Sequence, residues 1–124
     1  MYIIDPDTSI SDALSVLLAT YGIVVQAFKD AESFIASDKV AKLNEGCLLV
    51  DATLPGLSCL SLVREVKKQK SSPPIIILAN AASTQFRKQA LSIGVADVLE
   101  KPLMNEFLLA RISTLMPIGT NLPK

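Results

Sequence analysis

The chain has 124 residues, in which 12 Lys and Arg balance 12 Asp and Glu, half of the residues are hydrophobic and His is absent. This length corresponds to one domain of ordinary size, and the high apolar content without net charge excludes intrinsic disorder. His-based catalysis is excluded, and an isoelectric point of about 6.2 argues against nucleic-acid binding through bulk charge.

The pattern of apolar and charged residues predicts neither a membrane span nor a secretion signal. No apolar run approaches the roughly 18 residues that a bilayer span requires. The first residues, Met1–Asp5, lack the basic segment of a signal peptide. We therefore expect a soluble, cytoplasmic domain that binds no membrane.

Short apolar runs alternate along the chain with longer stretches of helical spacing. Continuous hydrophobicity is typical of a strand buried on both faces. The runs that predict strands are Met1–Ile4, Ile23–Val25, Cys47–Val50, Ile75–Leu78 and Val98–Leu99.

The stretches between and after these runs predict five helices. The first carries apolar residues at helical spacing from Ile10 to Leu18, with capping candidates at Thr8, Ser9 and Ser11 and a stop at Gly22. The other four helices are predicted around Ala31–Ile35, Leu60–Val66, Phe86–Ile93 and Phe107–Leu115.

Five strand-then-helix units in series predict a doubly wound α/β fold, with one parallel sheet and helices on both faces. The flavodoxin-like strand order 2-1-3-4-5 suits five such units. We expect one domain over Met1–Leu115. The last stretch, Met116–Lys124, has two prolines and a Gly without a helical stripe, which predicts the start of a linker in a longer chain.

Polar residues follow the predicted strands. They are Asp5-Pro6-Asp7, Asp51-Ala52-Thr53, Ala79-Asn80 and Glu100-Lys101-Pro102. Because sites in open parallel sheets form at the carboxyl ends of the strands, we expect two or three carboxylates and one ammonium to converge there. Such a group can hold a hard divalent cation and leave the Lys for a phosphoryl oxygen. An Asp at this edge can act as a nucleophile and form an aspartyl phosphate.

These residues give the chain a resemblance to bacterial response-regulator receiver domains, over roughly Met1–Leu115. The matching motifs are Ile4-Asp5, then Leu48-Leu49-Val50-Asp51 followed by Leu54-Pro55-Gly56 and Ser58, and finally Glu100-Lys101-Pro102. The acceptor loop after Asp51 is the most diagnostic of the three.

The resemblance implies a role for each matched residue. Asp51 would accept a phosphoryl group from a sensor histidine kinase or a phosphotransfer protein of a two-component system, and Lys101 would bind the phosphoryl group. Asp5, Asp51 and the backbone carbonyl of Thr53 would hold Mg²⁺, with Asp7 as a tentative further ligand. The resemblance also suggests a cis peptide bond between Lys101 and Pro102.

The resemblance further implies how the signal leaves the domain. The face made by the fourth helix, fifth strand and fifth helix would relay the signal to an effector domain in the same longer chain. The same face is a candidate contact for a homodimer. On this interpretation the domain itself binds no nucleic acid and is no enzyme beyond its own phosphorylation and dephosphorylation.

The chain departs from the family at three positions. Pro6 stands where a second acid is expected, so Mg²⁺ binding is expected to be weak. Ala79 lacks the hydroxyl that would bond the phosphoryl group, and Val98 replaces an aromatic residue. We expect a phosphoryl group to be transmitted weakly, and the output face to stay in one state.

Simpler interpretations of the same residues remain open. Asp51 can cap the turn after its strand, Asp5 can close the first strand, and Lys101 can be a solvated charge. Asp7 stands immediately before a helix, where an N-cap is the leading interpretation.

The cysteines and several other residues are expected to have a structural role only. Cys47 and Cys59 are predicted as small buried hydrophobic residues. Ser83 and Thr84 are predicted as caps of the fourth helix, and the Lys residues at 67, 68 and 70 as a solvated helix end.

Three other functions compete with a phosphorylated receiver. One is a pseudo-receiver, an interaction or dimerisation module without phosphate control, which the three departures favour. A small phosphohydrolase would need a second Asp two residues after the nucleophile, where this chain has Thr53. A nucleotide or flavin site is disfavoured because the loop Asp5–Thr8 has two acids and no Gly.

Overall fold

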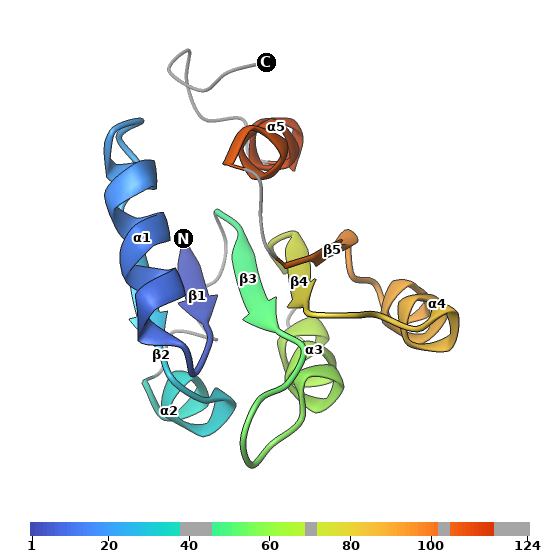
Figure 1. The fold of residues 1–124 in the computed structure, drawn as a ribbon. Coiled ribbons are helices and arrows are strands. Elements are labelled where there is room, and N and C mark those ends of the chain that lie inside the picture. Colours follow the sequence, from blue (N-terminus) through green and yellow to red (C-terminus); the bar gives the residue numbers. More distant parts are fainter. Residues whose placement is uncertain (38–45, 69–71, 102–104, 116–124) are drawn as a thin grey trace.

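Five parallel strands form one sheet in the order β2-β1-β3-β4-β5 (Figure 1). This computed structural model describes residues 1–37, 46–68, 72–101 and 105–115. The strands are β1 Tyr2–Ile4, β2 Gln26–Phe28, β3 Leu48–Asp51, β4 Ile75–Ala79 and β5 Asp97–Glu100. The doubly wound, flavodoxin-like α/β fold is therefore confirmed.

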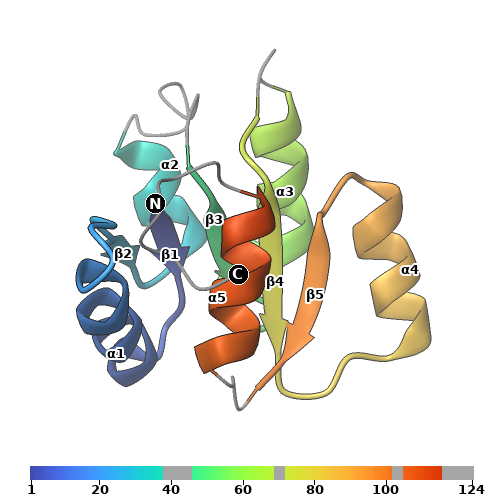
Figure 2. The same cartoon turned by 90° about the horizontal axis from the view of Figure 1, so that it is seen from above.

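Helices cover both faces of the sheet (Figure 2). They are α1 Thr8–Ala19, α2 Ala31–Ala36, α3 Cys59–Lys67, α4 Thr84–Ser92 and α5 Asn105–Leu115. One core cluster packs α2, α3 and α4 against the sheet, and the other packs α1 and α5 against the opposite face. None of the helices in the described ranges has the length and hydropathy needed to cross a bilayer.

The central strands are apolar on both faces because both faces are covered. All residues of β3 and β4 are buried. Their register pairs Asp51 with Leu78, and Ala79 with Glu100 on β5. The carboxyl ends of β3, β4 and β5 therefore lie next to one another, which positions the candidate site.

The position of β2 differs from the sequence prediction. The apolar run Ile23–Val25 precedes the strand, which begins at Gln26. Ile23 is 6% exposed, and its backbone N–H donates to the carbonyl of Leu18 at the end of α1. β2 is an edge strand with an exposed start, so its own residues carry little apolar signal.

The predicted burial of both cysteines is confirmed. Cys47 and Cys59 are each 2% exposed. Burial raises the pKa of each thiol to about 12, and the charge of Asp51 adds to the effect at Cys59. Both residues therefore act as small apolar side chains of the core.

The helix caps follow the sequence only in part. Ser83 caps α4, as predicted, by accepting the N–H of Phe86. The cap of α1 is Asp7 rather than Thr8, Ser9 or Ser11. Of the lysines near the end of α3, Lys68 pairs with Glu65 at the surface, Lys67 donates to the hydroxyl of Ser72, and position 70 lies outside the described residues.

Candidate functional site

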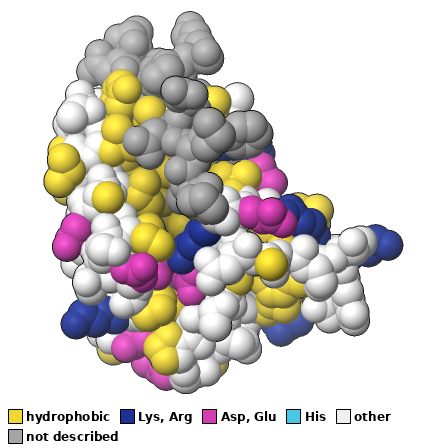
Figure 3. Space-filling model, viewed as in Figure 1, with side chains coloured by type: hydrophobic (Ala, Val, Ile, Leu, Met, Phe, Trp, Pro, Cys, Tyr) yellow, Lys and Arg dark blue, Asp and Glu magenta, His cyan; other side chains and the backbone are white. Residues whose placement is uncertain are grey.

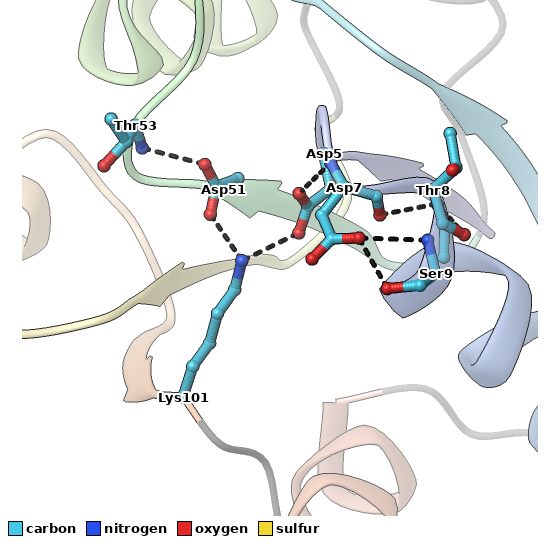
Figure 4. A network of polar contacts seen from close by, with 8 residues as sticks. Asp5, Asp7, Thr8, Ser9, Asp51, Thr53 and Lys101 are labelled. Atoms are coloured by element: carbon cyan, nitrogen blue, oxygen red, sulfur yellow. Dashed lines mark hydrogen bonds and ion pairs between the residues drawn. The ribbon is translucent and has the colours of Figure 1, made fainter.

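The centre of the site is an ammonium group held between two carboxylates (Figure 4). Lys101 Nζ lies 3.0 Å from Asp5 Oδ2 and 2.7 Å from Asp51 Oδ1. Asp5 follows β1, Asp51 ends β3 and Lys101 follows β5. The structure thus brings together the three residues that the sequence places at strand ends.

Both carboxylates are buried and have further hydrogen-bond donors. Asp5 is 1% exposed and Asp51 is 6% exposed. The second oxygen of Asp5 accepts the N–H of Asp7 at 2.8 Å, and the second oxygen of Asp51 accepts the N–H of Thr53 at 3.0 Å. Each carboxylate is therefore fixed in orientation by one backbone donor and by Lys101.

Lys101 is fixed by its backbone as well as by its charge. Its N–H donates to the carbonyl of Ala79 at 2.7 Å, which extends the pairing of β4 and β5. Burial of the side chain acts to lower the pKa of Lys101, but the hydrogen bonds and charges of Asp51 and Asp5 outweigh it and raise the pKa. The side chain is thus a permanent cation at neutral pH.

The side chain of Asp7 lies beside Asp5 but makes its hydrogen bonds with Ser9 (Figure 4). It is exposed, and one of its oxygens accepts both the N–H of Ser9 at 3.0 Å and the hydroxyl of Ser9 at 2.6 Å. The hydroxyl hydrogen bond is the main cause of a lowered pKa at Asp7. The N-cap interpretation of Asp7 is therefore confirmed, because its carboxylate is committed to the first turn of α1.

The residues of the site fit a divalent cation in type but fall short in number. Carboxylate and carbonyl oxygens are the ligands that Mg²⁺ takes. Asp5 and Asp51 with Lys101 leave one net negative charge. Within the described ranges, no three His, Cys, Asp or Glu side chains lie close enough together to hold a metal. The donor set here is two carboxylates, with the backbone carbonyl of Thr53 as the remaining candidate.

A family model for the response regulator receiver domain matches residues 1–113. The chain belongs to this family. It is 34% identical over 114 residues to the transcriptional regulatory protein FixJ of Bradyrhizobium diazoefficiens, covering 92% of this chain and 55% of FixJ. It is 30% identical over 119 residues to the response regulator protein TmoT of Ectopseudomonas mendocina, covering 96% of this chain and 53% of TmoT.

Solved structures agree with this assignment. Full-length FixJ from B. japonicum superposes with a TM-score of 0.81 at 34% identity, over 92% of this chain and 55% of FixJ. A CheY-like receiver domain from Methanospirillum hungatei gives 0.82 at 25% identity, over 91% of this chain and 89% of that one. This receiver domain spans about half the length of the curated relatives it matches.

The acceptor loop of the receiver domain is held by a residue that the sequence analysis missed. Glu32, on α2, accepts the N–H of Leu57 with both carboxylate oxygens at 3.3 Å. Gly56 has a φ of +70°, and a Cβ at this position would meet the carboxylate of Glu32. No local pattern identifies Glu32, because its partner is 25 residues away.

A cavity of about 410 Å³ adjoins the acceptor loop. Its walls include Ala52 and Thr53 of that loop, Ala79 and Asn80 after β4, and Phe86 on α4. Ala79 is one of the small side chains in this lining. On the face of the molecule seen in Figure 3, acidic and basic side chains lie side by side near the middle of that face.

The raised pKa of Lys101 makes the domain sensitive to high pH. A group whose pKa is higher in the folded chain stabilises the fold below its ordinary pKa of 10.5, and this contribution is lost as the pH rises through the folded value. We expect the contribution of Lys101 to the free energy of unfolding to fall above about pH 10.5, in addition to the loss that the two buried thiols cause from about pH 9, measured by urea denaturation between pH 8 and 12.

A Lys101→Met variant is the control for this measurement. It is expected to be less stable at pH 8, because two buried carboxylates lose their cation, and to lose less stability at high pH. Both cysteines also titrate in this range, but they do so equally in the two proteins. Equal alkaline losses in both proteins would contradict the prediction.

Glu32 and Gly56 are expected to depend on one another. Gly56→Ala should destabilise the fold by roughly 1–2 kcal/mol, because a Cβ at positive φ is strained and here also meets Glu32. In a Glu32→Ala background the same substitution should cost less, since the collision is removed. A double-mutant cycle by urea denaturation measures this coupling, and strictly additive losses would refute it.

Proposed function

We propose that this receiver domain accepts a phosphoryl group on Asp51 from a sensor histidine kinase or a phosphotransfer protein, with Mg²⁺ as cofactor. The observation that carries the proposal is the ion pair of Lys101 with Asp5 and Asp51 at the carboxyl ends of the strands. It supplies a carboxylate acceptor, a neighbouring acid and a cation in one place. The family membership of the chain supports the same function.

The chemistry follows from these groups. An oxygen of Asp51 forms a bond to phosphorus while the bond between phosphorus and the donor's nitrogen or oxygen breaks, and the departing group keeps that electron pair. Negative charge on the transferred group is stabilised by the ammonium of Lys101, which can turn from the carboxylate to a phosphoryl oxygen. The N–H of Thr53 keeps Asp51 in place during the transfer.

We propose that Asp5, Asp51 and the backbone carbonyl of Thr53 are the ligands of Mg²⁺. The ion would neutralise charge on the transferring group. Pro6 supplies no third carboxylate, and one oxygen of Asp7 is engaged in capping α1, so binding is proposed to be weak.

The relay of the signal is a further part of the proposal. The chain spans about half the length of relatives such as the transcriptional regulatory protein FixJ, so we propose that residues 116–124 begin a linker to a C-terminal effector region. The output surface would be α4, β5 and α5, which is also the candidate homodimer face. We further propose that the domain works in the cytoplasm without binding nucleic acid itself.

A pseudo-receiver is the second candidate function. It is favoured by one specific observation: the positions that would sense a phosphoryl group are apolar and buried. Ala79 is 3% exposed and Val98 is 4% exposed. In this alternative the same fold presents a partner-binding surface without phosphate control.

Phosphorylation is tested by intact-protein mass spectrometry after incubation with acetyl phosphate and Mg²⁺. We expect one phosphoryl adduct on the natural chain and none on Asp51→Asn, because the amide lacks a nucleophilic oxygen anion. Absence of the adduct under conditions that phosphorylate an ordinary receiver would favour the pseudo-receiver.

The weak Mg²⁺ site is tested by restoring the missing acid. Pro6→Asp should bind Mg²⁺ more tightly by on the order of tenfold, since the charge and number of oxygen ligands set affinity. Isothermal titration calorimetry measures the dissociation constant. Ala79→Thr is the matched control, because it restores a group on the phosphoryl side and should leave Mg²⁺ affinity unchanged. If Pro6→Asp binds no better than the natural chain, the assignment of this edge as the metal site is wrong.

A further inference from the structure

The usual side chains that would couple the acceptor site to the output surface are absent from this chain. Ala79 offers no hydroxyl to a group on Asp51, and Val98 is a small buried residue in β5 that does not reach the surface. The relation of α4 to β5 must therefore depend on other contacts. The structure shows one such contact in Arg87.

Arg87 connects α4 to β5 through two hydrogen bonds. Its Nη1 donates to the backbone carbonyl of Val98 at 2.8 Å, and its Nη2 donates to Glu100 Oε1 at 3.0 Å. β5 is the edge strand of the sheet, with β4 as its strand neighbour. The guanidinium thus gives the Val98 carbonyl a partner that no further strand supplies.

The remaining attachment of α4 is slight. Within this helix only Ala90 is fully buried. Phe86 is partly buried and borders the cavity beside the acceptor loop, and Leu91 is 53% exposed. Both ribbon views place α4 beside β5 at the end of the sheet (Figures 1 and 2). A helix held by so little apolar packing depends strongly on its polar contacts.

The cavity beside the loop after Asp51 limits the packing of the first turn of α4. The 410 Å³ between the acceptor loop and the first turn of α4 is lined in part by small alanine side chains. A helix end that borders a cavity packs against fewer side chains, so contacts elsewhere contribute more to holding it. Arg87 makes such a contact, since its partners Val98 and Glu100 lie on β5.

We propose that Arg87 is a lock that holds α4 on β5 in one conformation, whatever the state of Asp51. This proposal has two parts: Arg87 holds α4 on β5, and phosphorylation of Asp51 does not change this. Only the second part rests on the proposed function. Its first part, the attachment of α4, concerns the unphosphorylated chain. The consequence is an α4–β5 surface that is presented to a partner continuously rather than on demand.

The position of Glu100 explains why the lock tolerates a change at the site. Glu100 is the residue before Lys101, whose N–H is bound to the carbonyl of Ala79. This backbone bond anchors the end of β5 while the Lys101 side chain turns toward a new partner. The acceptor of the Arg87 hydrogen bond therefore stays in place when the ammonium moves.

The first part is tested by amide hydrogen exchange of α4, residues 84–92, in the unphosphorylated chain. Arg87→Ala should exchange at least several-fold faster there, and Glu100→Gln should give a smaller increase because the Val98 contact remains. Lys88→Ala is the matched control, since it removes the same charge from an exposed neighbour on the same helix. Unchanged protection of β4 shows that each variant is folded. Equal α4 protection in Arg87→Ala and the natural chain overturns the lock.

The second part is tested by adding beryllofluoride and Mg²⁺, with binding followed by fluorine NMR. The natural chain with the mimic bound should keep its α4 exchange rates within about twofold, while Arg87→Ala remains fast in both states. A large change in α4 of the natural chain overturns the insensitivity. Failure of the mimic to bind instead counts against the proposed phosphorylation, and the first experiment still decides whether Arg87 holds α4.

Discussion

The fold of this receiver domain depends on one ammonium group between two buried carboxylates. Burying Asp5 and Asp51 without a partner would be costly, because an ionised group loses its hydration in the interior. Lys101 offsets part of that cost, since its ammonium lies 3.0 Å from Asp5 and 2.7 Å from Asp51. The same contact joins the ends of β1, β3 and β5, so the requirement to neutralise charge also fixes the geometry of the site.

Much of this arrangement follows from the sequence because it depends on local pattern and on sheet topology. The uninterrupted apolar runs at Leu48–Val50 and Ile75–Leu78 identify strands that are covered on both faces. Parallel strands then bring their following residues to one edge, which predicts that Asp5, Asp51 and Lys101 meet. The position of β2 could not be predicted in the same way, because an edge strand needs little apolar character. The apolar Ile23 packs into the core from the end of α1 instead.

Residues whose hydrogen-bond partners lie far away in the sequence could not be predicted from it, for a related reason. Glu32 and Arg87 are ordinary charged residues on helices, where a solvated side chain is the usual expectation. Their partners lie 25 and 11 to 13 residues away and include backbone groups, which have no residue-type signature. Asp7 shows the opposite case. Its role as a cap depends on the next few residues, and the sequence identified it as the leading interpretation.

The proposed acceptor chemistry and the proposed relay of the signal would depend on different side chains. A hydroxyl at position 79 would contribute one charge-assisted hydrogen bond, worth roughly 1.5–3 kcal/mol, while coupling between distant sites is typically about 1–3 kcal/mol. Absence of that bond would remove most of the coupling in the proposed relay, whereas the ion pairs of Lys101 with Asp5 and Asp51 are intact. The contacts of Arg87 stabilise α4 from the side of β5 and need no signal from Asp51. Under the proposed function, substitutions could therefore alter the contacts between α4 and β5 without disturbing Asp51, because different side chains carry the two properties.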